Sequence, residues 1–200
     1  MIISFTTSPT RIHKCRPMLD SLLNQTEKPE LILLNIPKQF RRTGETYDIP
    51  EYVLNNVTVN VAEEDYGPAT KIIPTIKHLK EHQYPGDTRI IYLDDDIFYQ
   101  DKMVETIYKL ADDKNVYTAT GFHIIENRIT GIRVNLANAT IAEGYGGVCV
   151  TLDTFEDDFL PYIEKYTLQD LDFYLSDDMV LSNYYHKKGR KIKIINQIGK

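Results

Sequence analysis

The sequence predicts a single α/β domain, residues 1–200, with a mostly parallel central sheet flanked by helices and a mixed or antiparallel C-terminal half. In the first half, short apolar runs alternate with segments that have apolar residues at helical spacing. This order is typical of parallel strands joined by right-handed crossovers. After about residue 115, apolar runs follow one another without long helices between them. A chain of 200 residues fits one domain with a sizeable core.

The strands of the first half are short apolar runs bounded by turn residues, and its helices have apolar residues three or four positions apart. Pro17 suits the first turn of a helix, whereas Pro74 must lie in the first turns of its helix or bend it. The expected strands are 2–7, 30–37, 56–62 and 88–93, and the expected helices are 16–26, 67–82 and 100–113.

The second half has fewer helical patterns and more β-branched runs. The expected strands are 115–125, 128–135, 144–152 and 191–195, and the expected helices are 157–166 and 176–189. The sequence stops shortly after the last of these runs, which is compatible with a domain cut from the N-terminal part of a longer polypeptide.

The composition indicates a globular protein. Hydrophobic residues make up 42% and charged residues 26%, values that argue against disordered, collagen-like and membrane classes. The net charge of -6 argues against nucleic-acid binding, which needs a basic face. Cys15 and Cys149 are too few for a disulfide framework, so we expect packing residues in a reducing compartment. No signal peptide or transmembrane segment is visible, and we expect a cytoplasmic location.

Polar clusters follow three of the expected parallel strands. Ligands of open parallel sheets bind outside the carboxyl ends of the strands, so we expect these clusters to open into one crevice. After the first, third and fourth strands come, respectively, Thr7, Ser8 and Arg11; Glu63, Glu64, Asp65 and Tyr66; and Asp94, Asp95 and Asp96.

The acidic triplet has two interpretations. It is a turn or helix start with capping carboxylates, or it is a metal site. On an extended backbone Asp94 and Asp96 share one face and Asp95 lies on the other, and two carboxylates suit Mg²⁺ or Mn²⁺. Arg11 and Lys71, expected near the same crevice, suit a diphosphate unless they are ordinary surface charges.

Three later motifs also have two interpretations each. Gly144, Gly146 and Gly147 either allow a turn or form the wall of a sugar pocket. Asp177 and Asp178 follow Ser176 at an expected helix start, where they either favour the positive helix end or supply a general base. The segment 186–193, which is rich in basic residues, matches the end of a helix. A patch that binds an acceptor phosphate or a membrane surface is the alternative.

Four segments in order, "SFTTSPTR", "DYGPATKIIPTI", "IYLDDDIFY" and "SDDMVLS", resemble GT-A glycosyltransferases, and in particular the small glycosyltransferase domains of large DNA viruses such as the chlorella viruses. The resemblance covers most of the chain. It implies a GT-A (Rossmann-like) fold, a UDP-sugar donor and Mn²⁺ or Mg²⁺ bound through the acidic motif. It also implies a nucleotide-binding half, residues 1–114, an acceptor and catalytic half, residues 115–200, and, for a viral chain, the host cytoplasm.

Matched motif by motif, the resemblance implies that Asp94 contacts the nucleotide or its metal and that Asp96 binds the metal. It further implies a nucleotide and diphosphate site lined by Thr6, Ser8, Arg11, Asp65 and Lys71. The remaining expected donor-site residues are Thr7, Tyr66, Asp95, Gly146 and Gly147. Many members have a further ligand, commonly a His, beyond the last helix. Nothing suitable follows His186 here, so that ligand lies in missing sequence or water completes the shell.

The leading hypothesis is a metal-dependent, inverting transfer of a sugar from a UDP-sugar to a hydroxyl of a glycan or glycoprotein. The general base is Asp178 or Asp177, with Asp178 favoured. A sugar nucleotidyltransferase is one alternative, although "SPTRIHK" is a poor match to the Gly-rich loop of that class. A non-catalytic nucleotide- or glycan-binding domain is the other.

Overall fold

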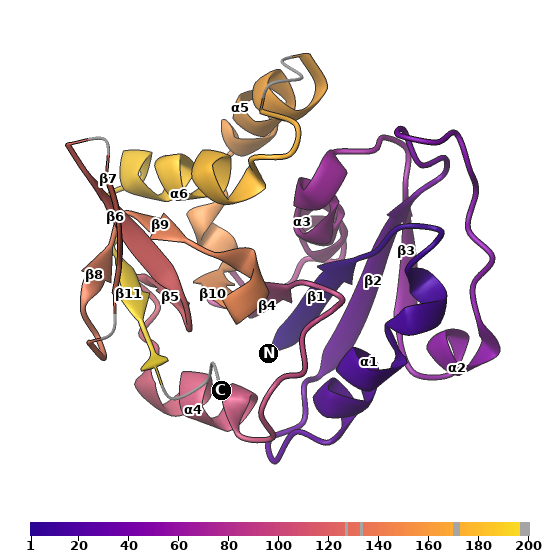
Figure 1. The fold of residues 1–200 in the computed structure, drawn as a ribbon, viewed down its shortest axis with the longest axis horizontal. Coiled ribbons are helices and arrows are strands. Elements are labelled where there is room, and N and C mark those ends of the chain that lie inside the picture. Colours follow the sequence, from indigo (N-terminus) through magenta and orange to yellow (C-terminus); the bar gives the residue numbers. More distant parts are fainter. Residues whose placement is uncertain (127, 133, 170–172, 197–200) are drawn as a thin grey trace.

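The computed structural model describes residues 1–126, 128–132, 134–169 and 173–196. They form an eight-stranded sheet of order β3-β2-β1-β4-β10-β5-β11-β8 and a three-stranded sheet of order β7-β6-β9 (Figure 1). The large sheet comprises β1 (Ile2–Thr6), β2 (Leu31–Pro37), β3 (Thr58–Ala62), β4 (Arg89–Leu93), β5 (Val116–Thr118), β8 (Asn138–Ala139), β10 (Val148–Thr151) and β11 (Ile192–Ile194). The small sheet comprises β6 (Gly121–Ile125), β7 (Arg128–Gly131) and β9 (Ile141–Ala142).

The large sheet is parallel on one side and mixed on the other. Strands β3, β2, β1 and β4 are parallel neighbours. Strand β10 runs antiparallel between β4 and β5, β11 is parallel to β5, and β8 is antiparallel to β11. The predicted mostly parallel sheet with a mixed second half is therefore confirmed.

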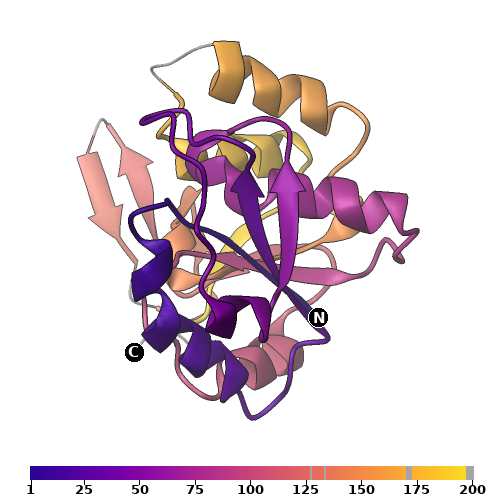
Figure 2. The ribbon, with the colours of Figure 1, turned by 90° about the vertical axis from the view of Figure 1, so that its right-hand side faces the viewer.

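Helices cover both faces of the large sheet (Figures 1 and 2). Alternate residues of the central strands point to opposite faces, so that Ile2 of β1 joins one core and Ile3 the other. One core includes α3 (Ile73–Glu81), α5 (Phe159–Glu164) and α6 (Asp177–Lys187). The other includes α1 (Arg16–Leu23), α2 (Glu51–Leu54) and α4 (Met103–Leu110). Short turns are η1 (Ile12–Lys14), η2 (Gly67–Lys71), η3 (Gly144–Gly146), η4 (Leu152–Thr154) and the π-helix η5 (Lys165–Gln169).

Several expected elements are divided in the structure. The helix expected over 67–82 is η2 followed by α3, and Pro74 lies in the first turn of α3, where its missing N–H costs no hydrogen bond. The strand expected over 115–125 is β5 plus β6, which belong to different sheets. The strand expected over 144–152 is a strand only in β10, because η3 precedes it. Residue 133 of the strand expected over 128–135 lies outside the described residues.

Both cysteines are buried and free, as predicted for packing residues. Within the described ranges, none of the helices combines the length and the apolar character needed to cross a membrane.

Candidate active site

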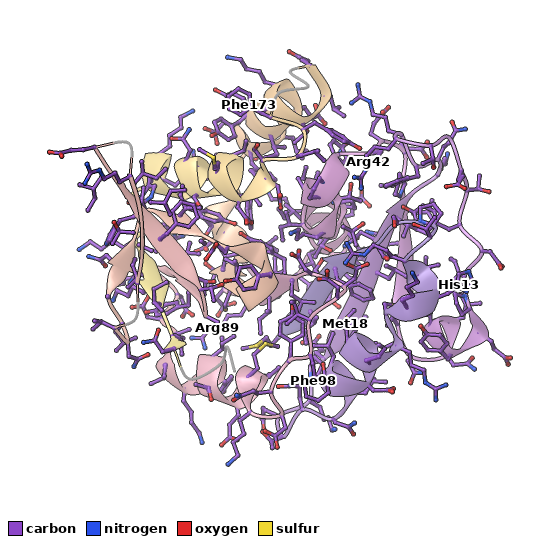
Figure 3. The ribbon with its side chains drawn as sticks, viewed as in Figure 1. His13, Met18, Arg42, Arg89, Phe98 and Phe173 are labelled. Atoms are coloured by element: carbon purple, nitrogen blue, oxygen red, sulfur yellow. The ribbon has the colours of Figure 1, made fainter. Side chains whose placement is uncertain are left out.

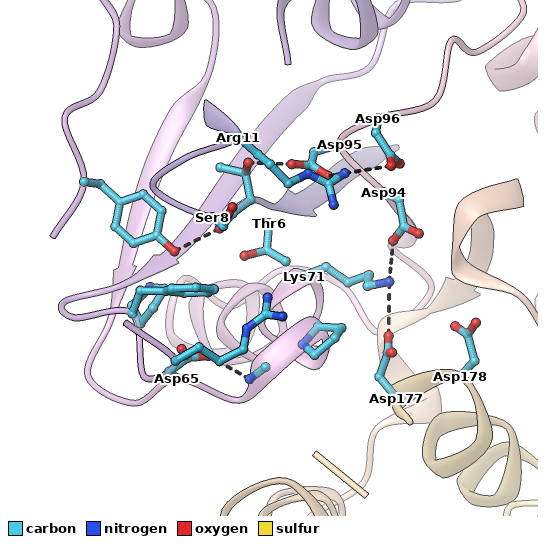
Figure 4. Close-up of a pocket in the computed structure, with 17 residues that line it drawn as sticks. Thr6, Ser8, Arg11, Asp65, Lys71, Asp94, Asp95, Asp96, Asp177 and Asp178 are labelled. Atoms are coloured by element: carbon cyan, nitrogen blue, oxygen red, sulfur yellow. Dashed lines mark hydrogen bonds and ion pairs between the residues drawn. The ribbon is translucent and has the colours of Figure 1, made fainter. Parts of the chain in front are cut away.

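A pocket of about 260 Å³ opens at the carboxyl ends of β1 and β4 (Figure 4). Strands β2 and β3 lie on one side of β1 and β4 lies on the other, so the pocket is at the point where the strand order reverses. Most of the expected site residues line it: Thr6, Thr7, Ser8, Arg11, Asp65, Lys71, Asp94, Asp95, Asp96, Asp177 and Asp178.

The first charge cluster is buried and centred on Lys71. Its Nζ lies 2.5 Å from Oδ1 of Asp94 and 3.1 Å from Oδ2 of Asp177, and only 4% of its side chain is exposed. Burial lowers the pKa of Lys71, but Asp177, Asp94 and Asp178 outweigh it and hold the pKa above its ordinary value. A charged ammonium is thus fixed between the end of β4 and the start of α6.

Asp178 lies beside this cluster. Its Oδ1 accepts a hydrogen bond from the backbone N–H of Gly144 at 2.9 Å. Burial and the neighbouring Asp177 raise the pKa of Asp178 to about 7. A Cβ at Gly144 would lie 2.7 Å from Nζ of Lys71 and 3.0 Å from Oδ1 of Asp178. η3 therefore packs closely against this cluster at Gly144, where a side chain would displace Lys71 or Asp178.

The second charge cluster is more exposed and centred on Arg11. Its Nη2 donates to Oδ1 of Asp95 at 2.5 Å and lies 2.8 Å from Oδ2 of Asp96. Oδ2 of Asp95 accepts from the Thr7 hydroxyl at 2.5 Å. Burial raises the pKa of Asp95 despite these donors, whereas 60% of the Asp96 side chain is exposed. Asp95 is thus directed toward the end of β1, while Asp94 faces Lys71.

The carboxylates of Asp94 and Asp96 are the candidate ligands for a divalent metal in this pocket. In the part of the chain that the structure describes, no three or more His, Cys, Asp or Glu side chains come together as a metal site. The carboxylates of Asp94 and Asp96 supply hard oxygen ligands, and they lie beside Lys71 and Arg11, two cations suited to a diphosphate. Mg²⁺ or Mn²⁺ commonly binds one or two carboxylates together with water and phosphate. Asp94 is paired with Lys71 and Asp96 with Arg11, and these two carboxylates are the residues that would hold such an ion. His186 contacts the Thr140 carbonyl oxygen at 2.6 Å, in the last turn of α6.

The other end of the pocket is aromatic and basic. The guanidinium of Arg42 lies 4.8 Å from the ring centre of Phe40, near η2 and α3 (Figure 3). The Tyr47 ring meets Phe40 edge-on at 6.4 Å, and its hydroxyl donates to the Thr7 carbonyl at 2.9 Å. Phe40, Arg42 and Tyr47 are not among the site residues expected from the sequence. They follow the carboxyl end of β2, so the rule applied to the other strand ends would have found them.

Asp65 lines the pocket, but both of its carboxylate oxygens accept backbone hydrogen bonds. Oδ2 accepts from the N–H of Arg41 at 2.8 Å, and Oδ1 accepts from the N–H of Gly67 at 2.7 Å. Tyr66, expected beside it, does not line this pocket, and its hydroxyl lies 2.8 Å from Nζ of Lys77. Asp65 therefore holds the loop after β2 against η2.

Gly146 and Gly147 do not line this pocket either, and their conformations serve the turn. A Cβ at Gly146 would lie 2.2 Å from Oγ1 of Thr120, and Gly147 has a φ of 75°, which favours glycine. Of the three glycines, Gly144 is the one whose backbone contacts the carboxylate cluster.

The start of α6 is also informative. Ser176 occupies the N-cap position but makes no capping hydrogen bond through its side chain. The next two carboxylates contact Lys71 and Gly144 rather than acting only on the end of their own helix. The first turn of α6 is thus part of the pocket, and the helix-end interpretation of these aspartates does not account for their contacts.

A scan against protein-family models finds no match, and a search of curated proteins finds none. Among solved structures, the chain is similar to galactosyltransferase LgtC in complex with donor and acceptor sugar analogs. That likeness has a TM-score of 0.50 and 13% identity and covers 96% of this chain and 72% of that one.

The chain is also similar to residues 1–349 of S. aureus TarS, with a TM-score of 0.54 and 13% identity over 98% of this chain and 57% of that one. The same TarS fragment in complex with UDP gives a TM-score of 0.51 and 14% identity. This chain therefore spans little more than half of the TarS fragment. At such identities the likeness shows the fold alone, and it confirms the predicted single α/β domain of GT-A type.

Proposed function

We propose that this chain is a glycosyltransferase that moves a sugar from a UDP-sugar donor to a hydroxyl of a glycan or glycoprotein acceptor. The observation that carries the proposal is the buried ammonium of Lys71, held between Asp94 and Asp177 where the strand order reverses. The fold shared with galactosyltransferase LgtC and with the UDP complex of TarS supports it. A viral origin and a cytoplasmic location stay predictions from the sequence.

The two ends of the pocket suit the two ends of a nucleotide sugar. Phe40, Tyr47 and Arg42 would contact the nucleoside, because aromatic and guanidinium groups stack on flat bases. Lys71 and Arg11 would bind the diphosphate through charge-assisted hydrogen bonds. The sugar would then lie toward the start of α6.

Asp94 and Asp96 would hold Mn²⁺ or Mg²⁺ next to the diphosphate. The bound ion supplies positive charge that stabilises the leaving diphosphate. Lys71 adds a second, permanent positive charge, because its carboxylate neighbours keep its pKa high and burial prevents it from moving into solvent.

Asp178 is the proposed general base. Asp177 is engaged by Lys71, whereas Asp178 contacts a backbone N–H and has a pKa raised to about 7, close to the value that suits a base at neutral pH. Asp178 takes the proton of the acceptor hydroxyl. At the same time the hydroxyl oxygen bonds to the anomeric carbon, and the bond from that carbon to the diphosphate breaks. Attack on the face opposite the leaving group inverts the anomeric centre.

The test is UDP release from a panel of UDP-sugars, with Mn²⁺ or with a chelator, in the presence of glycan acceptors. We expect one donor to give UDP and a glycosylated product in a metal-dependent manner. Formation of a UDP-sugar from UTP and a sugar phosphate would instead identify a nucleotidyltransferase. Tight UDP binding without transfer from any donor would support the binding-domain alternative.

A further inference from the structure

A group of polar side chains lies in the core directly beneath Lys71. Ser4 of β1, Asn35 of β2 and Thr75 of α3 are fully buried, and the two strands are otherwise mainly apolar. Burying polar groups is costly unless they are hydrogen-bonded. Three such residues from separate parts of the sequence at one point therefore call for a physical reason.

These side chains form a connected network. Nδ2 of Asn35 lies 2.9 Å from Oγ of Ser4 and 2.8 Å from Oγ1 of Thr75, and the two hydroxyls are 2.6 Å apart. Asn60 of β3 donates to Oδ1 of Asn35 at 2.9 Å, which fixes the orientation of the Asn35 amide. Each member thus restrains the others.

The network contacts the backbone of Lys71. The Ser4 hydroxyl donates to the Lys71 carbonyl oxygen, and Nδ2 of Asn35 lies 3.3 Å from the same oxygen. This carbonyl lies at the break between η2 and α3, where Ile72 has φ -125° and ψ -39°, away from ideal helical values. A carbonyl at such a break is held by side chains rather than by a regular helix.

We propose that Ser4, Asn35 and Thr75 are positioning residues that fix the backbone of Lys71 and so place its ammonium between Asp94 and Asp177. None of the three lines the pocket. The side chain of Lys71 runs from the break toward those carboxylates (Figure 4). The direction of the Lys71 side chain depends on the backbone conformation of Lys71, and the network holds that backbone through its carbonyl oxygen. The consequence for donor binding rests on the proposed function, whereas the placement of Lys71 does not.

Two substitutions at Thr75 separate positioning from packing. Thr75→Val keeps the shape of the side chain and removes the hydroxyl, whereas Thr75→Ser keeps the hydroxyl and removes a methyl group. A packing role predicts greater harm from Ser, and a positioning role predicts greater harm from Val. Ser4→Ala removes the direct donor to the Lys71 carbonyl. Thr167→Val is the matched control. Thr167 of η5 is a fully buried threonine, and its hydroxyl donates to the Ile163 carbonyl at 2.9 Å.

The first measurement is the rate at which acetic anhydride acylates Lys71 in the absence of nucleotide. Mass spectrometry of peptides from the acylated protein gives this rate. We expect the rate to rise roughly ten-fold in Ser4→Ala and Thr75→Val, as for loss of one hydrogen bond, and to stay near wild type in Thr75→Ser and Thr167→Val. The second measurement is the affinity for UDP with Mn²⁺, which should weaken in the same two variants.

Two results would overturn the proposal. One is an acylation rate of Lys71 in folded Ser4→Ala and Thr75→Val that equals the wild-type rate. The other is a larger rise of this rate in Thr75→Ser than in Thr75→Val. Thermal unfolding shows which variants are folded, and the Thr75 pair decides the question if Ser4→Ala is too unstable. Absence of UDP binding by the wild type would count against the proposed function alone, because acylation is measured without nucleotide.

Discussion

Two charge clusters of similar composition flank the same pocket, yet their surroundings differ. Lys71 lies between two carboxylates with 4% of its side chain exposed, whereas Arg11 lies between two carboxylates with 46% exposed. Exposed ion pairs contribute little and are screened by salt. Loss of one partner from a buried pair leaves a desolvated charge and is strongly destabilising. The Lys71 cluster is thus a fixed part of the site. In the Arg11 cluster, Arg11 and Asp96 are free to rearrange around a ligand, whereas Asp95 is buried and held by Thr7.

The largest expected effect lies beside the buried cluster. Asp178→Asn should lower turnover by something like 10² to 10⁴ and keep the affinity for UDP, because it removes the proposed proton acceptor and retains the shape of the side chain. Asp177→Asn should lower turnover less, since Asp177 pairs with Lys71. Rates with donor and acceptor, combined with calorimetry of UDP, check this. A product with retained anomeric configuration would rule out the assigned base.

The exposed cluster contributes the next effect. Asp96→Ala should weaken Mn²⁺-supported UDP binding by roughly 10- to 100-fold or more, because it removes one of the two proposed protein ligands. The fold should persist, since 60% of this side chain is exposed. Calorimetry with Mn²⁺ and with a chelator measures the difference. Equal affinity in the wild type and the variant, or no effect of the chelator, would contradict the metal site.

Lys71→Met sharpens the comparison between the clusters. The variant keeps the apolar stem and removes the charge, and loss of a charge-assisted contact of roughly 1.5 to 3 kcal/mol should weaken UDP binding about ten-fold or more. Unfolding should also require less denaturant, because Asp94 and Asp177 lose their cation. The more exposed counterpart, Arg11→Met, should cost less stability, because 46% of the Arg11 side chain is exposed and the buried Asp95 keeps its hydrogen bond from Thr7. Equal losses of stability in the two variants would show that burial does not distinguish them.

The smallest effect is a pH dependence of stability. The carboxyl of Asp178 has a pKa raised from 3.8 to about 7, so the folded state favours its neutral form. This contribution to stability is present below about pH 4 and is lost as the pH rises through 7. Asp178→Asn should therefore raise Tm more at pH 8 than at pH 4, by about 2–4 °C for each kcal/mol regained, in chelator and without nucleotide. An equal shift at both pH values would contradict this.

The parallel half of the fold could be predicted because strands and helices alternate in it with clear periods. The division of 115–125 into β5 and β6 could not, because the run is nearly continuous in apolar character. The chain leaves β5 after Thr118, and from Gly121 it pairs with β9, where a Cβ would lie 2.5 Å from the Ile141 carbonyl oxygen. Contacts of this kind depend on tertiary pairing, which the local pattern does not contain.

Much of the candidate site could be predicted from the strand ends, because β1, β3 and β4 are parallel strands of the same sheet and their carboxyl ends lie at one edge of it. Arg42 and Tyr47 were missed because the strand-end rule was not extended to the loop after β2, which has no recognisable motif of its own. Tyr66 and the network under Lys71 depend on directions of side chains within η2 and the core. Spacing along the chain does not determine those directions.

Strand β10 lies between β4 and β5 although it follows both in the sequence. On the ribosome, Arg89–Leu93 therefore emerges well before the strand that pairs with one of its edges, and unpaired edges attract other chains. Lys71 likewise meets Asp177 only after α6 has been synthesised. A nascent or truncated chain ending near residue 114 would expose that edge together with an incompletely paired lysine. We expect such a fragment to need a chaperone, or to aggregate, rather than to fold as a free-standing nucleotide-binding unit.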